Sequence, residues 1–491
     1  MLKLLIAGVV GISLVSTLAI IIKNKPEIWF WIFLNLFFDP GGYVSYYLGG
    51  NIIGPINITD AVIAGMILCL IYEKFNWKII YQDQFFVKFL FFLLLFTAYY
   101  FIIYGGVAPY LNNDFDYPTF LLKNRIFVYG IIILISIYLF TLKGLKYFYI
   151  TTLSIGTICL SLYLVTLLTR VNLIPVIEVE RYGHIGMMRI SMASYGLFDL
   201  IFPLALATYL LSRKIDLTLK YKPWLYYSAI IMLITLILTL TKRTQIDIIA
   251  SVFIIVIIIS YLFRTGKFSE IIKLAVPTIL VLLALYLTFP DYIDYMITTS
   301  NDTFSLMTTG KNTVGETDYR ITGTDDLDVT KEYIKNNLLL GTGYTYLYWG
   351  PGYATSPRGA DFALAADAAG EVPIYYLLFG FGLIGAILMS PLYIMMVILF
   401  FKLARLLKLV IINYLSDPLT LVFSIYIILM IAGKFTYRVW NISVDFTGER
   451  MSETAIILGL GFALYFKIHL NTYNSKINSF TTLKNKTSRS R

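Results

Sequence analysis

Three arginines stand where a membrane chain usually carries no positive charge. Arg243 belongs to the stretch TLTKRTQID, which also contains Lys242 and lies between two runs of Ile, Leu and Val; Arg189 lies in GMMRISMASYGLFDLIF, and Arg320 in TDYRITGTDD. A guanidinium group is planar, keeps its charge on burial and can bind two phosphate oxygens at once. Three such groups near one membrane surface would bind a lipid-linked phosphate or diphosphate. The structural alternatives are an ion pair between Arg243 and Asp247, one turn later, and an Arg189 side chain that extends to lipid headgroups.

The elements that must position these arginines are membrane helices. The chain has 491 residues, of which 58% are hydrophobic and 14% charged, a composition too apolar for a soluble protein of this length. Its apolar runs of about 17 to 25 residues are long enough to cross a bilayer as helices. We therefore expect an all-α polytopic membrane protein with about 12 or 13 transmembrane helices, the lower number applying if the short segment 27–39 only dips into the membrane. The predicted spans are 4–22, 27–39, 59–73, 85–105, 126–142, 147–168, 193–212, 224–241, 246–263, 272–289, 373–400, 417–433 and 453–469.

Basic residues predict the orientation of these spans. Lys and Arg recur in alternate short connections and in the tail 470–491, which places them on one face, the cytoplasmic one. The net charge of +10 therefore reflects orientation rather than nucleic-acid binding. Lys242 and Arg243 fall on the outer face, against the usual bias, as do Arg170, Arg181 and Lys434 in ordinary loop surroundings. The outer connections are 106–125, 169–192, 242–245, 290–372 and 434–452, within a chain that forms a single integral membrane domain, 1–491.

The outer connection 290–372 is the longest, at about 80 residues, and loops of that size are usually functional or disordered. It contains a predicted amphipathic helix that lies over the membrane surface. Thr324 can cap this helix, and Asp325 and Asp326 suit the positive end of its dipole. Leu327, Ile334 and Leu338 recur at helical spacing before Gly341 ends it.

Two other patterns indicate no chemistry. GFGLIG at 380–385 fits the dinucleotide-binding pattern G-x-G-x-x-G, but it lies inside an apolar helix, where its glycines favour close helix packing. Cys69 and Cys159 fall in apolar segments and form no metal or disulfide pattern. There is no P-loop, HExxH or Cys/His cluster, so we expect neither an ATP motor, a metal nor a cofactor.

Three segments between about 185 and 400 resemble the O-antigen polymerase and O-antigen ligase superfamily of membrane glycosyltransferases. They are TKR followed by a long apolar helix, RITGTDDLDVTKEYIKNNLLLGTGYTYL in the outer loop, and DAAGEVPIYYLLFGFGLIGAIL at the return to the membrane; RISMASYGLFDLIFPLALA also fits an earlier arginine segment of the family. Ligases of this family carry a histidine near the start of the return helix, where this chain has Glu371. The departure favours a polymerase, in which acidic residues such as Asp367 stand in this region.

The resemblance implies a GT-C-like fold and transfer of a glycan from undecaprenyl diphosphate to a sugar hydroxyl of an acceptor. Repeat units would be polymerised into a surface polysaccharide (O-antigen, capsule or exopolysaccharide) at the bacterial inner membrane, with the active site facing the periplasm or cell exterior. The implied partners are the lipid-linked donor and acceptor and, as a further candidate, a chain-length regulator. The alternatives are a ligase that hands the finished glycan to another acceptor and, in a different class, a lipid-linked oligosaccharide flippase or transporter.

In this family chemistry, Arg243 and Arg320 would stabilise the leaving diphosphate, with Lys242 beside them and Arg189 as a third arginine contact. Asp367 and Glu371, just before the return helix, are the candidate general bases. The alternatives are that Asp367 is a solvated loop charge, that Glu371 caps the helix dipole, and that the reaction needs no base.

Three further residues complete the predicted site. Asp199 lies inside a predicted span and would orient Arg189 or Arg243. Tyr344 and Tyr346 follow the loop helix, and their rings would stack on sugar faces. The competing explanation for these tyrosines is a tyrosine-rich membrane interface.

Overall fold

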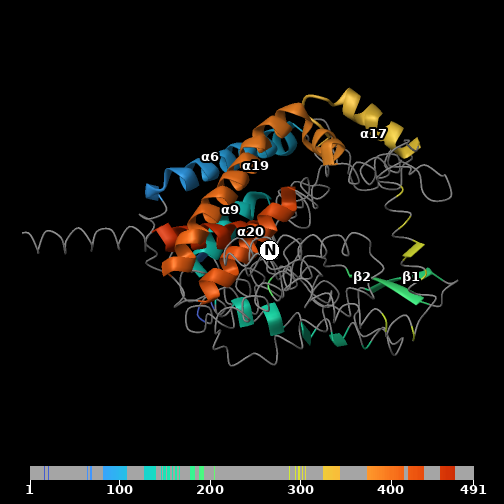
Figure 1. The fold of residues 1–491 in the computed structure, drawn as a ribbon. Coiled ribbons are helices and arrows are strands. Elements are labelled where there is room, and N and C mark those ends of the chain that lie inside the picture. Colours follow the sequence, from blue (N-terminus) through green and yellow to red (C-terminus); the bar gives the residue numbers. More distant parts are fainter. Residues whose placement is uncertain are drawn as a thin grey trace, which may run out of the picture.

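The computed structural model of the chain is mainly helical, with one two-stranded hairpin (Figure 1). It describes residues 81–107, 126–139, 177–182, 187–192, 325–342, 373–413, 418–435 and 454–469, together with single helical residues and short helical groups between 16 and 305. The predicted helical class is therefore confirmed for most of this part of the chain, and the hairpin is a departure from it.

Helix α6 (Gln84–Tyr100) begins at Asp83, whose carboxylate accepts a hydrogen bond from the backbone N–H of Phe86 at 2.8 Å. An acceptor at this position satisfies a backbone donor that the first helical turn leaves free. One face of α6 is buried and aromatic, and the helix continues into the π-helical turn η1 (Phe101–Val107). The buried face carries Phe86, Phe89, Leu93 and Phe96, at the spacing of three and four residues that one helix face requires.

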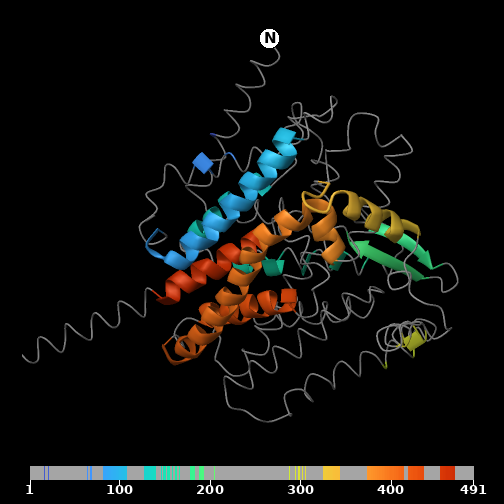
Figure 2. The same cartoon turned by 90° about the horizontal axis from the view of Figure 1, so that it is seen from above.

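Helix α19 (Pro373–Asn413) runs beside α6 and is interrupted at Gly382, where φ is 62° and ψ −173°. Figure 2 shows the long second part of α19 crossing the molecule and a short first part that leaves it at an angle. Helix α20 (Pro418–Phe435) packs against α19, and its residues 420–431 are all buried. The helix Thr454–His469 is likewise buried over most of its length. These last two helices form the centre of the described bundle.

Helix α9 (Ile126–Leu139) completes the bundle. A Cβ atom added to Gly130 would lie 3.4 Å from Leu93 of α6, and one added to Gly459 would lie 2.3 Å from the Cβ atom of Ser136. The absent side chain at Gly459 lets its helix approach α9 closely, as small residues do in membrane bundles, whereas 3.4 Å at Gly130 is an ordinary contact distance. The predicted helices at 85–105, 126–142, 373–400, 417–433 and 453–469 are thus confirmed as helices, with bounds that differ by a few residues except at the longer C-terminal end of α19.

Contacts at one end of the bundle give the directions of these helices. At one end, the start of α6 meets α19 and the last helix: the hydroxyl of Tyr465 donates to Asp83 at 3.1 Å, and Lys402 donates to Tyr465 at 3.4 Å. Lys467 donates to Thr420 at 2.9 Å, so α20 starts at this same end. α19 and the last helix therefore run antiparallel to α6 and α20. This is the alternation that the predicted spans require.

Among the residues that the structure describes, two helices are long and apolar enough to cross a membrane: Gln84–Gly106 and Leu377–Leu406. Their most apolar windows are only 28% and 33% buried, and large apolar side chains such as Phe91, Leu94, Ile387 and Phe401 are exposed. The core helix of a soluble protein would bury most of this surface. The other predicted spans lie outside the described residues or are represented by α9, by the shorter apolar helices or by isolated helical residues, so the number of crossings stays a prediction.

The hairpin pairs β1 (Ile177–Tyr182) with β2 (Met187–Met192) in antiparallel register, with Glu180 opposite Arg189. The hairpin lies within the predicted connection 169–192, directly before the predicted span 193–212, and departs from the prediction only in that an all-α chain was expected. Ile177 and Val179 alternate with Glu178 and Glu180, a two-residue period typical of strands that a search for long apolar runs passes over.

Candidate functional site

The loop segment 337–342 meets helix α19 at two glycines. Helix α17 (Asp325–Asn336) is followed by a turn in which the N–H of Gly341 donates to the carbonyl of Asn337 at 2.7 Å. Gly341 has a φ of 71° and lies directly against Gly382 of α19. We call residues 338–342 together with 379–384 the glycine crossing. The predicted amphipathic helix and its end before Gly341 are both confirmed.

Only glycine fits at the centre of the glycine crossing. A Cβ atom on Gly341 would lie 2.4 Å from the backbone nitrogen of Gly382, and a Cβ atom on Gly382 would lie 2.4 Å from the carbonyl oxygen of Leu339. Real Cβ contacts are not this short, and the atoms that would have to move are backbone atoms. Both glycines also have positive φ, which side chains disfavour. The two backbones therefore touch because neither residue has a side chain.

The interruption of α19 frees backbone groups, and the loop satisfies them. The N–H groups of Leu383 and Ile384 donate to the carbonyls of Leu338 and Leu339, at 2.8 and 3.1 Å. In return, the carbonyl of Phe379 accepts from the N–H of Thr342 at 2.7 Å and from its hydroxyl at 2.8 Å. Unpaired backbone groups are costly away from water, so a broken membrane helix is tolerated where such partners exist.

Tyr99 of α6 and Tyr104 of η1 bond to the remaining carbonyls. The hydroxyl of Tyr99 lies 3.0 Å from the carbonyl of Phe381 and 3.3 Å from that of Leu340. The hydroxyl of Tyr104 lies 2.9 Å from the carbonyl of Gly380 and also bonds to Leu340. Each hydroxyl, with its single proton, thus lies between one carbonyl of the loop and one of α19. Both tyrosines are buried, and their rings meet edge to face with centroids 6.2 Å apart.

Helix α17 is held on the first part of α19 by its buried face. Thr330 and Ile334 are buried, and the ring of Tyr333 meets that of Phe379 edge to face at 5.9 Å. The opposite face is charged: Lys331 donates to Asp328 at 2.7 Å, and this hydrogen bond raises the pKa of the exposed lysine. Figure 1 shows that α17 and the short first part of α19 leave the crossing on the same side of the molecule.

The chemistry of the glycine crossing is that of a scaffold. It consists of backbone groups, a threonine and two tyrosine hydroxyls whose protons are engaged by carbonyls. Within the part of the chain that the structure describes, no three His, Cys, Asp or Glu residues form a group that could hold a metal ion. The crossing is suited to hold two chain segments in a fixed relation, so any reacting group must come from the residues that flank it.

The structure places one of the predicted site residues, Arg189, in strand β2. The hairpin and α17 lie at the same end of the molecule, to the right in both Figure 1 and Figure 2. The other predicted site residues lie outside the described residues: Asp199, Lys242, Arg243, Arg320, Tyr344, Tyr346, Asp367 and Glu371. Their grouping therefore stays a prediction.

Sequence reasoning missed the tyrosines Tyr99 and Tyr104 and the role of Gly382. The glycines of GFGLIG were expected to permit close packing, and this is confirmed at Gly385, where a Cβ atom would lie 3.0 Å from the ring of Tyr99. Gly382 instead breaks the helix, as its backbone angles show. Nothing in the sequence distinguishes the two glycines, because the difference depends on the loop that approaches one of them.

A comparison of the sequence with known proteins finds no matching family model and no matching curated protein. The likeness to the O-antigen polymerase and ligase superfamily accordingly rests on the quoted sequence motifs alone.

Proposed function

We propose that this chain is a metal-independent membrane glycosyltransferase that polymerises undecaprenyl-diphosphate-linked repeat units into a surface polysaccharide. One observation carries the proposal: the two motif segments that resemble the superfamily, about 40 residues apart in the chain, are joined backbone to backbone at the glycine crossing. The loop segment ending in LLLGTG and the helix segment GFGLIG form one unit. The two motifs lie in different parts of the sequence, one in a loop and one in a helix. Their contact explains why both would be needed, if together they hold one site.

A membrane location supports the proposal. The exposed apolar faces of α6 and α19 suit contact with lipid tails, and the antiparallel order of the described helices agrees with the predicted spans. With the basic connections in the cytoplasm, the glycine crossing lies towards the outer face of a bacterial cytoplasmic membrane. Lipid-linked repeat units presented at that face are the proposed donor and acceptor.

Chain connectivity limits how far several predicted site residues can lie from the described residues. Glu371 precedes α19 by two residues, and Tyr344 follows Thr342 by two. Two residues of chain span at most about 7 Å, so each α-carbon stays within that distance of a described residue. Arg320 precedes α17 by five residues, which allows at most about 18 Å. The starts of α17 and α19 thus limit where Arg320 and Glu371 can lie.

The proposed reaction is a displacement at the anomeric carbon of the donor glycan. A hydroxyl oxygen of the acceptor sugar forms the new bond, the bond from carbon to the diphosphate oxygen breaks, and the hydroxyl proton passes to Asp367 or Glu371. Arg243 and Arg320 stabilise the charge that develops on the leaving lipid diphosphate, with Arg189 and Lys242 as further contacts. Fixed positive groups in a partly dry site are more effective than the same groups in water, because no solvent has to reorganise.

The test is incubation of the purified full-length protein with a lipid-diphosphate repeat unit. Wild-type protein should produce a ladder of lengthened glycans, and Arg243→Ala or Arg320→Ala should lower its rate by a factor of 100 or more, about the cost of losing one transition-state donor. Lys335→Ala on α17 is the control, since it removes a positive charge from the same loop without removing a predicted phosphate contact. A ladder formed equally well by both arginine variants would remove the proposed role of these residues.

The same assay separates the alternatives. Loss of a polymerase leaves single repeat units on the carrier, whereas loss of a ligase leaves long chains on it. A transporter with a broken helix commonly binds its substrate at the free helix ends. Here the N–H groups of Leu383 and Ile384, the ends freed by the break, are already bonded to the loop. This bonding favours a structural use of the break over a transport site.

A further inference from the structure

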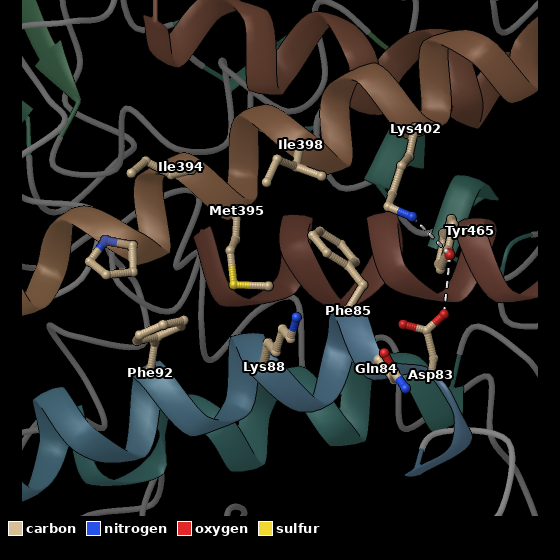
Figure 3. A pocket seen from close by; sticks show the side chains of 11 residues that line it. Asp83, Gln84, Phe85, Lys88, Phe92, Ile394, Met395, Ile398, Lys402 and Tyr465 are labelled. Atoms are coloured by element: carbon tan, nitrogen blue, oxygen red, sulfur yellow. Dashed lines mark hydrogen bonds between the residues drawn. The ribbon is translucent and has the colours of Figure 1, made fainter.

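A groove lies between α6 and α19 at the end of the bundle opposite the glycine crossing. It has a volume of about 670 Å³ and is lined from both helices and from the last helix. Figure 3 shows that one half is apolar and the other polar. The apolar half contains Phe92, Pro391, Ile394, Met395 and Ile398; the polar half contains Asp83, Gln84, Lys88, Lys402 and Tyr465.

The lysines Lys88 and Lys402 reach this groove from its two walls (Figure 3). The amine of Lys402 is held over the rings of Phe85 and Tyr465, at 5.0 and 5.1 Å from their centroids, and donates to the Tyr465 hydroxyl. Lys88 is exposed. Among the described residues, no carboxylate lies within ion-pair distance of either amine.

Asp83, the one carboxylate among the described residues that line the groove, is already hydrogen-bonded. Asp83 accepts from the backbone N–H of Phe86 with one oxygen and from the Tyr465 hydroxyl with the other. Tyr465 in turn orients the amine of Lys402. The described lining therefore carries two amines and one carboxylate, so its net charge is positive. The carboxylate is already hydrogen-bonded to Phe86 and Tyr465, which leaves the two amines for an anionic ligand.

We propose that this groove binds an anionic phospholipid, with its phosphate between Lys88 and Lys402 and one acyl chain along the apolar half. The groove has charged side chains in one half and apolar side chains in the other, which suits a ligand with a charged headgroup and an apolar tail. Ile394 and Ile398 are exposed, so the apolar half opens to the surroundings of the bundle, where lipid tails would lie. A free phosphate ion would leave this apolar half unoccupied.

The inference rests on a membrane location but not on glycosyl transfer. Basic residues assign this end of the helices to the cytoplasmic face, so the lipid comes from the inner leaflet, which is rich in anionic lipids. The site would hold the start of α6 and the second part of α19 together through a headgroup. It lies at the other end of α6 from Tyr99, and its occupant is distinct from a lipid-diphosphate donor at the outer face.

The experiment measures lipid retention by native mass spectrometry of the purified full-length protein. Phosphatidylglycerol is titrated in one arm, phosphatidylcholine in a second, and inorganic phosphate competes with phosphatidylglycerol in a third. Wild-type protein should retain phosphatidylglycerol in preference to phosphatidylcholine, and millimolar phosphate should not displace it. Lys88→Gln and Lys402→Gln should each weaken retention by about fivefold, the contribution of one basic residue at an anionic headgroup.

Two further variants make the outcome decisive. Arg405→Gln removes a positive charge one turn further along α19, outside the lining, and should leave retention unchanged. Ile398→Trp fills the apolar half, keeps both lysines and should reduce retention of the lipid. Equal loss with Arg405→Gln would reduce the effect to general surface charge, and displacement by phosphate would mean a simple anion site. Either result, or wild-type retention by Lys88→Gln, overturns the proposal; Lys88 is exposed, so its replacement does not endanger folding.

Discussion

Replacing Gly382 by alanine tests whether the glycine crossing holds α17 and the turn that follows it on α19. Gly382 has φ 62° and ψ −173°, a region that residues with a side chain almost never occupy. The added Cβ atom would also lie 2.4 Å from the carbonyl oxygen of Leu339 and 2.5 Å from the nitrogen of Gly341. Since both neighbours are backbone atoms, no flexible side chain can move away.

The cost of this substitution has two parts. Holding alanine in this conformation costs about 1 to 3 kcal/mol. Separating the two backbones also loses the bonds from Leu383 and Ile384 to the loop, each of which contributes about 1 kcal/mol net. The sum, about 3 to 5 kcal/mol, is a large part of the stability of a typical domain. This free-energy cost falls on the single contact between the loop and α19, so we expect the loop to detach before the bundle unfolds.

Hydrogen exchange measured by mass spectrometry is the appropriate assay. In Gly382→Ala, amide protection should fall in α17 and in the turn that follows it, with little change in α20. Gly106→Ala is the matched control, because a Cβ atom there meets nothing within 4 Å. If Gly382→Ala kept wild-type protection in α17, the glycine crossing would not be what holds the loop, and the scaffold assigned to the site would be wrong.

Three other substitutions test separate contacts. Tyr104→Phe keeps the buried ring but removes the donor to two carbonyls, and should weaken loop protection by about 1 to 3 kcal/mol in the same exchange experiment; unchanged protection would show that Tyr104 only packs. Gly459→Ala places a Cβ atom 2.3 Å from the Cβ atom of Ser136 and should destabilise the bundle by about 1 to 3 kcal/mol, measured by thermal unfolding. A variant that unfolds at the same temperature as the wild type would contradict this expectation. Tyr465→Phe removes the hydroxyl between Lys402 and Asp83 and should lower phosphatidylglycerol retention; retention equal to wild type would mean that Lys402 needs no such support.

The helices of the described core were predictable because their signals are local. A run of apolar residues between charged connections marks α6 and α20, and the bounds differ from the predictions by only a few residues. Helix α17 carries its own start and end: aspartates at its first turn, apolar residues at helical spacing and Gly341 beyond its last turn. Such signals lie within about 20 residues of chain, so no knowledge of the rest of the fold is needed to use them.

The hairpin and the glycine crossing were missed for different reasons. The strands β1 and β2 are short, and their two-residue period is a weak signal beside long apolar runs. The break at Gly382 has no local sign, since a glycine within an apolar helix is compatible with a straight helix. Tyr99 and Tyr104 look like ordinary apolar-helix residues, and only their carbonyl partners, more than 230 residues away, give them a role.

The apolar helical character of the chain and the amphipathic helix Asp325–Asn336 follow from the amino-acid order alone, because each depends on composition or on spacing along a short segment. The phosphate-binding role of the arginines stays a prediction. Only the tertiary structure decided that Gly341 touches Gly382, that two tyrosines bond to the carbonyls around them, and that Lys88 and Lys402 share one groove. These are contacts between segments far apart in the chain. Whether such segments meet depends on how every helix between them packs, which no local pattern encodes.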